Sequence, residues 1–152
     1  MRPQAFGVAL FLPAPLPAAA NSTSENTMKP AEVKKITPIL FAPELEPCIK
    51  FWTGRMGFQK TVEVPEGNKI GFVILEKNGL ELMYQSFASV EKDNPATAAA
   101  VRRGPAFLYI DVEDVEAALA ATQGVEMVMP VRATFYHSKE FGVKDPAGHY
   151  MI

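Results

Sequence analysis

Cys48, Glu81, His137 and His149 are the side chains whose type and surroundings could support chemistry in this sequence. Cys48 is the only cysteine, so it can form neither an intrachain disulfide nor a cysteine-based zinc cluster. Neither histidine lies near it in the sequence to serve as the base that a thiolate nucleophile needs. We therefore expect Cys48 to be a small buried residue.

The two histidines are weak candidates for catalysis. His137 lies in a stretch that we expect to form a loop or strand edge, where functional residues often occur, but it lacks a paired carboxylate that would support general-base catalysis. His149 follows the glycine of a predicted turn, and we expect it to be a hairpin residue rather than a metal ligand.

Glu81 is the other weak catalytic candidate. It lies in the predicted strand Leu80–Gln85, where alternation places it on one face with Met83 and Gln85, while the opposite face packs on helices. If Glu81 is buried without a partner, its pKa is raised and it can act as an acid or a base. If it pairs with a basic side chain or faces water, it has a structural or solubilising role.

Two similar sets of elements position these residues. The first set is a strand, a helix and three strands, predicted over Ile36–Ala42, Glu46–Met56, Phe58–Val64, Ile70–Leu75 and Leu80–Gln85. The second set has the same order, predicted over Phe107–Val112, Glu113–Gln123, Val125–Met129, Phe141–Lys144 and His149–Ile152. The helix-ending glycines Gly57 and Gly124 are 67 residues apart, and the hairpin glycines Gly79 and Gly148 are 69 apart, which indicates a tandem repeat. Between the sets, Ser89–Gly104 is predicted to be a linker that can carry a helix.

Charge and composition exclude several classes of partner. The net charge is -2, from 15 basic and 17 acidic side chains that are not grouped into runs, so the sequence lacks the basic surface of a nucleic-acid-binding protein. No apolar stretch approaches the roughly 20 residues of a membrane-spanning helix. We therefore expect neither a nucleic-acid nor a membrane partner.

Residues 1–33 are expected to be an extension and linker that precede the domain. Residues 1–20 have some features of a signal peptide, but three prolines, Pro13, Pro15 and Pro17, interrupt the helix that its apolar segment normally forms. We favour an upstream extension over residues 1–27 and a soluble cytoplasmic protein, with export as the alternative. The domain is expected over residues 34–152, and we expect its last strand to be cut short at the C-terminus.

Two segments resemble the vicinal-oxygen-chelate superfamily of glyoxalases, bleomycin-resistance proteins and extradiol dioxygenases. The first is Leu45–Trp52 followed by Met56–Phe58, and the second is the final hairpin Phe141–His149. The resemblance implies an α+β fold in which two tandem βαβββ modules form a cupped, mixed-sheet cavity. It also implies a homodimer.

Metal-dependent members of that superfamily hold the ion with histidine, glutamine or glutamate side chains on four strands. The corresponding positions in this sequence are Thr37, Glu81, Phe107 and Ile152. Only Glu81 has a ligating side chain, and one carboxylate cannot hold a transition metal. We therefore expect no metal and no cofactor, as in the bleomycin-resistance branch.

Apolar and aromatic side chains are predicted to line the cup. The predicted ligand-binding residues are Phe41, Glu81, Met83, Phe107, Tyr109 and Tyr136. Such a lining suits a small apolar or aromatic molecule, although the same side chains could simply fill the cup. We expect a binding protein rather than an enzyme. The alternatives are a metal-dependent lyase, isomerase or dioxygenase with an unorthodox site, and a pseudo-enzyme with an interaction role.

Overall fold

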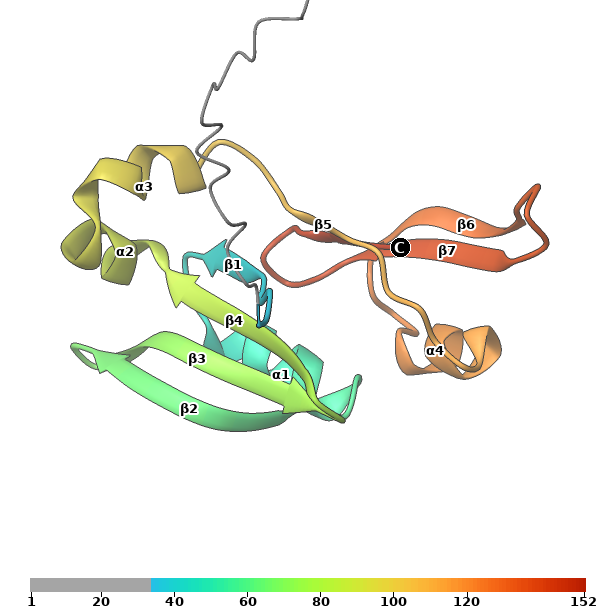
Figure 1. The fold of residues 1–152 in the computed structure, drawn as a ribbon, viewed down its shortest axis with the longest axis horizontal. Helices are drawn as coiled ribbons and strands as arrows, with labels where there is room; N and C mark the ends of the chain where they lie inside the picture. Colours follow the sequence, from blue (N-terminus) through green and yellow to red (C-terminus); the bar gives the residue numbers. More distant parts are fainter. Residues whose placement is uncertain (1–33) are drawn as a thin grey trace, which may run out of the picture. The chain divides into compact units, whose positions relative to one another are not determined.

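The computed structural model describes residues 34–152, so the expected extension over residues 1–33 lies outside the described residues. The described chain forms two four-stranded mixed sheets with helices (Figure 1). This is the predicted α+β fold of two tandem modules. No helix within residues 34–152 is long and apolar enough to cross a membrane.

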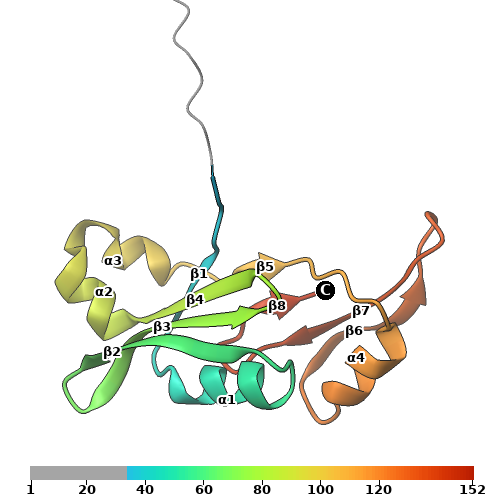
Figure 2. The same cartoon turned by 60° about the horizontal axis from the view of Figure 1, so that its bottom comes forward.

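The two modules have the same strand order. In the first, the order is β1-β4-β3-β2, with the elements β1 (Ile39–Ala42), α1 (Glu46–Gly54), β2 (Gln59–Glu66), β3 (Lys69–Lys77) and β4 (Leu80–Ser86). In the second, the order is β5-β8-β7-β6, with the elements β5 (Phe107–Leu108), α4 (Val115–Ala121), β6 (Met127–Ala133), β7 (Lys139–Lys144) and β8 (Tyr150–Met151). In each sheet the last strand lies beside the first and is parallel to it. This shared topology confirms the tandem repeat (Figure 2).

Local sequence explains where the first module turns. Pro47 lies in the first turn of α1, where its missing N–H removes no helical hydrogen bond. Gly57 follows that helix with a φ of +71°. Asn78 and Gly79 have φ values of +53° and +79°, as the two-residue hairpin between β3 and β4 requires.

The connection between the modules is helical. The segment predicted as a linker with a possible helix forms two short helices, α2 (Phe87–Asp93) and α3 (Pro95–Val101). Ser86 caps α2 by accepting a hydrogen bond from the Ser89 N–H at 3.1 Å.

The core is concentrated in the first module. One face of its sheet buries side chains against α1, namely Leu40, Ala42, Val73, Leu75, Leu82 and Tyr84, and α1 contributes Cys48, Phe51 and Trp52. This confirms the face that alternation predicted for Leu82 and Tyr84, whereas Leu80, predicted on the same face, is exposed because it lies beside the hairpin turn. In the second module Val143 and Met151 are the buried apolar side chains, and α4 has no buried residue.

A chain of buried hydrogen bonds joins the modules. The Trp52 indole N–H donates to the Tyr84 hydroxyl at 2.8 Å, and that hydroxyl donates to Asp145 in the β7–β8 turn. The other carboxylate oxygen of Asp145 accepts from the backbone N–H groups of Ala147 and His149. The polar side-chain atoms of Trp52, Tyr84 and Asp145 therefore all have hydrogen-bond partners although their surroundings are apolar.

Two neighbouring strands of the second sheet, β5 and β8, are shorter than the sequence predicted. Strands were expected over Phe107–Val112 and His149–Ile152, but β5 and β8 each contain two residues. The last hydrogen bond between them runs from the Ile110 N–H to the Ile152 carbonyl at 2.8 Å.

Candidate functional site

The face of the first sheet that points away from α1 carries three of the predicted ligand-binding residues, Phe41, Glu81 and Met83. Phe41 on β1 and Met83 on β4 are both half-buried and alternate with fully buried neighbours. Ile39 lies on the same face and pairs in register with Met83. This face is therefore apolar and open, as alternation predicted.

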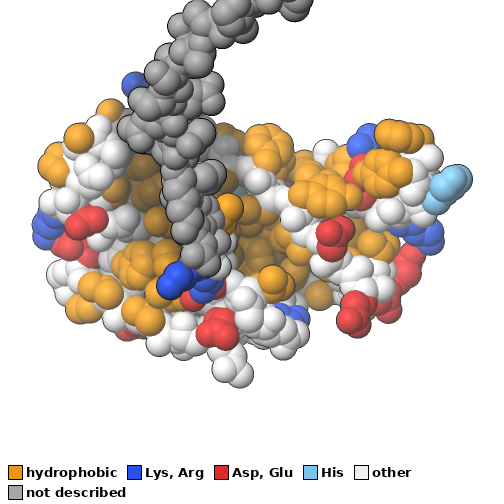
Figure 3. Space-filling view, viewed as in Figure 1, with side chains coloured by type: hydrophobic (Ala, Val, Ile, Leu, Met, Phe, Trp, Pro, Cys, Tyr) orange, Lys and Arg blue, Asp and Glu red, His pale blue; other side chains and the backbone are white. Residues whose placement is uncertain are grey.

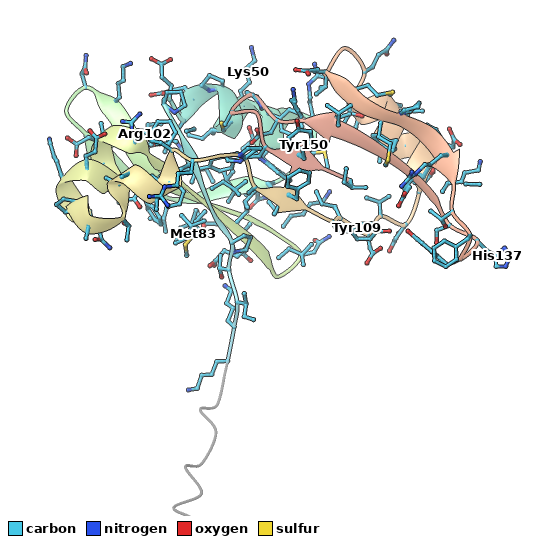
Figure 4. All side chains as sticks on the ribbon, turned by 90° about the horizontal axis from the view of Figure 1, so that it is seen from above. Lys50, Met83, Arg102, Tyr109, His137 and Tyr150 are labelled. Atoms are coloured by element: carbon cyan, nitrogen blue, oxygen red, sulfur yellow. The ribbon has the colours of Figure 1, made fainter. Side chains whose placement is uncertain are left out.

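The second sheet presents an exposed aromatic face. Phe107 and Tyr109 are 69% and 61% exposed, which is unusual for such large apolar side chains. The ring of Phe107 stacks on Tyr150 with the centroids 4.6 Å apart and the planes 6° apart. Figure 4 shows Tyr109 and Tyr150 on this sheet and Met83 on the first sheet. In the space-filling view hydrophobic side chains line a hollow between the two halves of the described unit (Figure 3).

A polar cluster brings Tyr109 and Tyr136 together beside Glu140. The Glu140 carboxylate, 8% exposed, accepts from Arg132 at 2.8 and 2.6 Å and from the Tyr136 hydroxyl at 3.0 Å. Hydrogen bonds from Arg132, which has the larger effect, and from Tyr136 stabilise the ionised form of Glu140 and hold its pKa below its usual range. Hydrogen bonding to Tyr109 and Glu140 raises the pKa of Tyr136 to about 12.

Sequence reasoning missed Arg132 and Glu140. They are register partners in the β6–β7 hairpin, and the bend of this hairpin contains Tyr136. Both residues lie just outside the predicted strands Val125–Met129 and Phe141–Lys144, because β6 and β7 extend further toward the hairpin bend than predicted. The register that pairs them could not be deduced from the sequence because the ladder contains bulges.

Glu81 is paired rather than buried alone. Lys35 lies 2.7 Å from one of its carboxylate oxygens, and the Thr37 hydroxyl donates to the other at 3.2 Å. The hydrogen bond from Lys35 has the larger effect, and together with that from Thr37 it holds the pKa of Glu81 below its usual range. The pairing with Lys35 is the arrangement in which we expected Glu81 to have a structural role. A carboxylate that is ionised in this way does not support acid catalysis at neutral pH.

The donor set does not fit a transition metal. The positions aligned with the first and fourth strands of metal-dependent proteins, Thr37 and Glu81, do lie together, but a lysine ammonium group contacts the only carboxylate. Phe107 stacks on Tyr150 and offers no ligand atom, and the same holds for the side chain of Ile152. Within residues 34–152, no three His, Cys, Asp or Glu side chains gather as a metal site.

The two histidines and Cys48 lie in different surroundings. His137 lies at the far tip of the β6–β7 hairpin with a φ of +66°, away from Met83 and Tyr150 (Figure 4). His149 is 6% exposed, and both its ring nitrogens are hydrogen-bonded to backbone groups. Cys48 is buried, and desolvation followed by the Asp145 charge raises the pKa of its thiol to about 12. None of the three has the partners of a catalytic group.

A pocket of about 310 Å³ lies in the second module, between α4 and the inner strands of the sheet. Its walls come from the segment after β5, from β7 and from α4, and they include Ile110, Asp111, Ala118 and Phe141. Of the predicted ligand-binding residues only Tyr109 lines it. Phe41, Glu81, Met83 and Phe107 lie on strands outside this pocket, and Tyr136 lies in the bend of the β6–β7 hairpin.

Comparison with solved structures shows the same fold at low sequence identity. TioX from Micromonospora sp. ML1 is 18% identical with a TM-score of 0.63, covering 76% of this chain and 93% of that chain. Lactoylglutathione lyase from Agrobacterium tumefaciens is 16% identical with a TM-score of 0.59, covering 81% and 92%. A bleomycin-binding protein from Streptomyces verticillus, solved with copper(II)-bleomycin, is 18% identical with a TM-score of 0.52, covering 80% and 94%.

Sequence comparison identifies the family. No curated protein matches the chain significantly. A family model described as Glyoxalase/Bleomycin resistance protein/Dioxygenase superfamily matches residues 33–151, which is most of the chain and both modules. The chain belongs to the glyoxalase/bleomycin resistance protein/dioxygenase superfamily.

Proposed function

We propose that this protein binds a small, largely apolar or aromatic molecule without a metal. The observation that carries the proposal is the exposed aromatic face of the second sheet, where Phe107 is 69% exposed and already stacks on Tyr150. Exposed aromatic rings in a fixed orientation bind planar molecules by stacking and by burial of apolar area.

The neighbouring residues support this chemistry. Phe41 and Met83 add an apolar surface on the first sheet. Tyr109 and Tyr136 add hydroxyl groups that can orient a ligand, and Glu140 fixes Tyr136 through a hydrogen bond. Glu81 lies on the same strand as Met83, and the ion pair with Lys35 neutralises its charge.

The ligating side chains favour a binding protein over the metal-dependent alternative. A lyase, isomerase or dioxygenase of this superfamily would need several ligands, whereas Glu81 is the single ligating side chain in the four aligned positions and is engaged by Lys35. A structural neighbour binds bleomycin, an organic molecule, which is consistent with the binding role. The identity of the ligand is a separate question, because one fold serves many functions.

Thermal unfolding with a panel of planar aromatic compounds tests the proposal. A ligand that binds the native state raises the melting temperature as its concentration rises. We expect this increase to disappear in Phe107→Ala and Tyr109→Ala. It should persist in Leu80→Ala, a matched loss of a 64% exposed apolar side chain at the β3–β4 hairpin.

Two results would overturn the proposal. One is the absence of any concentration-dependent shift across compounds of suitable size, which would favour the pseudo-enzyme alternative. The other is a stoichiometric divalent ion in the purified protein whose removal abolishes a measurable activity.

We further propose that the chain forms a homodimer and that residues 1–33 lie outside the domain. Large exposed apolar side chains such as Val62 and Val64 on β2 support association of two copies. Light scattering after size-exclusion chromatography should give twice the chain mass. A chain that begins at Met28 should unfold at the temperature of the full chain.

A further inference from the structure

A groove of about 680 Å³ lies between α1 and the second module. One wall is a single face of α1 and includes Lys50, Phe51, Gly54 and Arg55, while the other wall includes Val125 before β6 and Lys144 at the end of β7. The groove shares no lining residue with the pocket beside α4. It is also separate from the proposed ligand-binding faces, because Lys50 and Met83 lie on opposite sides of the first module (Figure 4).

Positive charge is in excess along this groove. Three basic side chains line it, and Lys144 is the one that pairs with an acidic side chain, Glu126, at 2.7 Å. Within residues 34–152 neither Lys50 nor Arg55 forms an ion pair. The other acidic residue of the groove, Asp145, is 5% exposed, and both its carboxylate oxygens already accept hydrogen bonds. Two uncompensated cations therefore border the groove.

The guanidinium group of Arg55 is held in place and still has donors to offer. Its Nη1 donates to the carbonyl oxygens of Ala121 at 3.1 Å and Gln123 at 2.8 Å, at the end of α4. These bonds use two of the five N–H donors of the group. Those on Nε and Nη2 have no acceptor among residues 34–152. This edge of a guanidinium binds the two oxygens of a carboxylate or phosphate together.

Gly54 leaves room in the groove beside these cations. Its φ is not positive, and a Cβ at this position would meet no atom within 4 Å. Neither the backbone nor crowding therefore requires glycine here, although glycine is less favourable than alanine in a helix. The space over Gly54 can be occupied by part of a ligand, and Phe51 and Val125 make the adjoining walls apolar.

We propose that this groove binds a small organic anion, in which a carboxylate or phosphate group is attached to a short apolar chain. The oxyanion binds the free edge of Arg55, and Lys50 supplies a second positive charge. The apolar chain lies over Gly54 against Phe51 and Val125. The volume is within the range of roughly 300–1,000 Å³ that is typical of small-molecule sites. Because the walls belong to both modules, binding also stabilises their association.

A titration of the full chain with sodium hexanoate, followed by amide NMR, tests the proposal, with hexyl phosphate titrated in parallel. We expect saturable changes in the amide signals of Lys50, Gly54 and Val125. The melting temperature should rise by about 3 °C or more at ten times the Kd. The anion with the lower Kd identifies the preferred group. Hexanol has the same chain without the charge and should cause neither effect.

Three substitutions of basic side chains test the charges. Lys50→Gln should raise the Kd by about fivefold, because it removes an exposed charge beside the anion. Arg55→Lys keeps the charge but loses the planar fork, and it should raise the Kd by about tenfold. Arg103→Gln removes one positive charge at an exposed position outside the groove. It should leave the Kd within about twofold, since solvent and salt screen a distant charge.

Two substitutions by leucine locate the apolar chain. Gly54→Leu fills the groove and should abolish the saturable changes, and the free variant should melt no lower than the natural chain because the position is open. Ala117→Leu adds bulk at an exposed position of α4 outside the groove and should leave binding unchanged. Phe107→Ala should also leave hexanoate binding unchanged, so this proposal and that for the aromatic face can fail separately.

Four results would overturn the proposal. The first is the absence of saturable changes with both anions, and the second is equal binding of hexanol, which would remove the role of charge. The third is an equal rise of the Kd in Lys50→Gln and Arg103→Gln, which would indicate attraction to the whole molecule. The fourth is loss of hexanoate binding in Phe107→Ala, which would assign the anion to the aromatic face instead.

Discussion

His149 Nε2 lies 2.8 Å from the carbonyl oxygen of Phe41, which joins the β7–β8 hairpin of the second module to β1 of the first. The opposite ring nitrogen, Nδ1, accepts from the Ala106 N–H at 2.9 Å, so the proton of the neutral imidazole must be on Nε2. One buried side chain therefore satisfies a donor and an acceptor on two separate segments. A second hydrogen bond between the modules in this region runs from the Tyr84 hydroxyl to Asp145.

His149→Ala should destabilise the fold by about 2–4 kcal/mol, because it leaves the Ala106 N–H and the Phe41 carbonyl without partners in a buried region. Chemical denaturation monitored by Trp52 fluorescence measures the change. His137→Asn is the control, since asparagine tolerates positive φ at that exposed turn and should shift stability by less than about 0.5 kcal/mol. Equal effects of the two substitutions would contradict the bridging role of His149.

Tyr84→Phe should lower the free energy of unfolding by about 1–3 kcal/mol. The substitution keeps the ring but leaves the Trp52 indole N–H and one Asp145 oxygen unpaired. Tyr150→Phe provides the comparison, because it keeps the stack on Phe107 and should change stability by less than about 0.5 kcal/mol. If Tyr84→Phe left the free energy of unfolding unchanged, a water molecule would have to replace the hydroxyl as the hydrogen-bond partner.

Glu140 should make stability fall in acid. Its folded-state pKa lies below that of the unfolded chain, so its contribution is present above about pH 4.3 and is lost as the pH falls through the lower folded value. Glu140→Gln should therefore be less stable than the natural chain at pH 7, and the difference should shrink below about pH 4. Unfolding curves of both proteins from pH 3 to pH 7 test this, and a difference independent of pH would contradict it.

Cys48 should not react with thiol reagents in the native protein. Its thiol is buried with a pKa raised to about 12, so the thiolate is scarce at pH 8. Colorimetric thiol titration should give no labelling in buffer and one thiol per chain after denaturation. In Ser138→Cys, an exposed position, one thiol should react at once. Rapid labelling of Cys48 in the native chain would show that this part of the core opens readily.

Part of the candidate site could be predicted from the sequence. Alternation placed Met83 on the face opposite to Leu82 and Tyr84, because a strand has a period of two residues and the buried face is set by packing on α1. The resemblance to metal-dependent members of the superfamily also aligned Thr37, which precedes β1, and Glu81 on β4 with two ligand positions, and their side chains are in contact. Lys35, which decides the ionisation of Glu81, could not be assigned, since it precedes β1 and belongs to no periodic pattern.

The sequence by itself determined the fold class, the repeat and the lack of ligating side chains at Thr37 and Phe107, because these follow from residue type, periodicity and turn chemistry within short segments. Only the tertiary structure decided which groups meet across segments. It paired Arg132 with Glu140 through a bulged ladder and joined the modules through His149. Those contacts depend on register and on the docking of two modules, which are set by packing over long sequence separations and leave no local pattern in the chain.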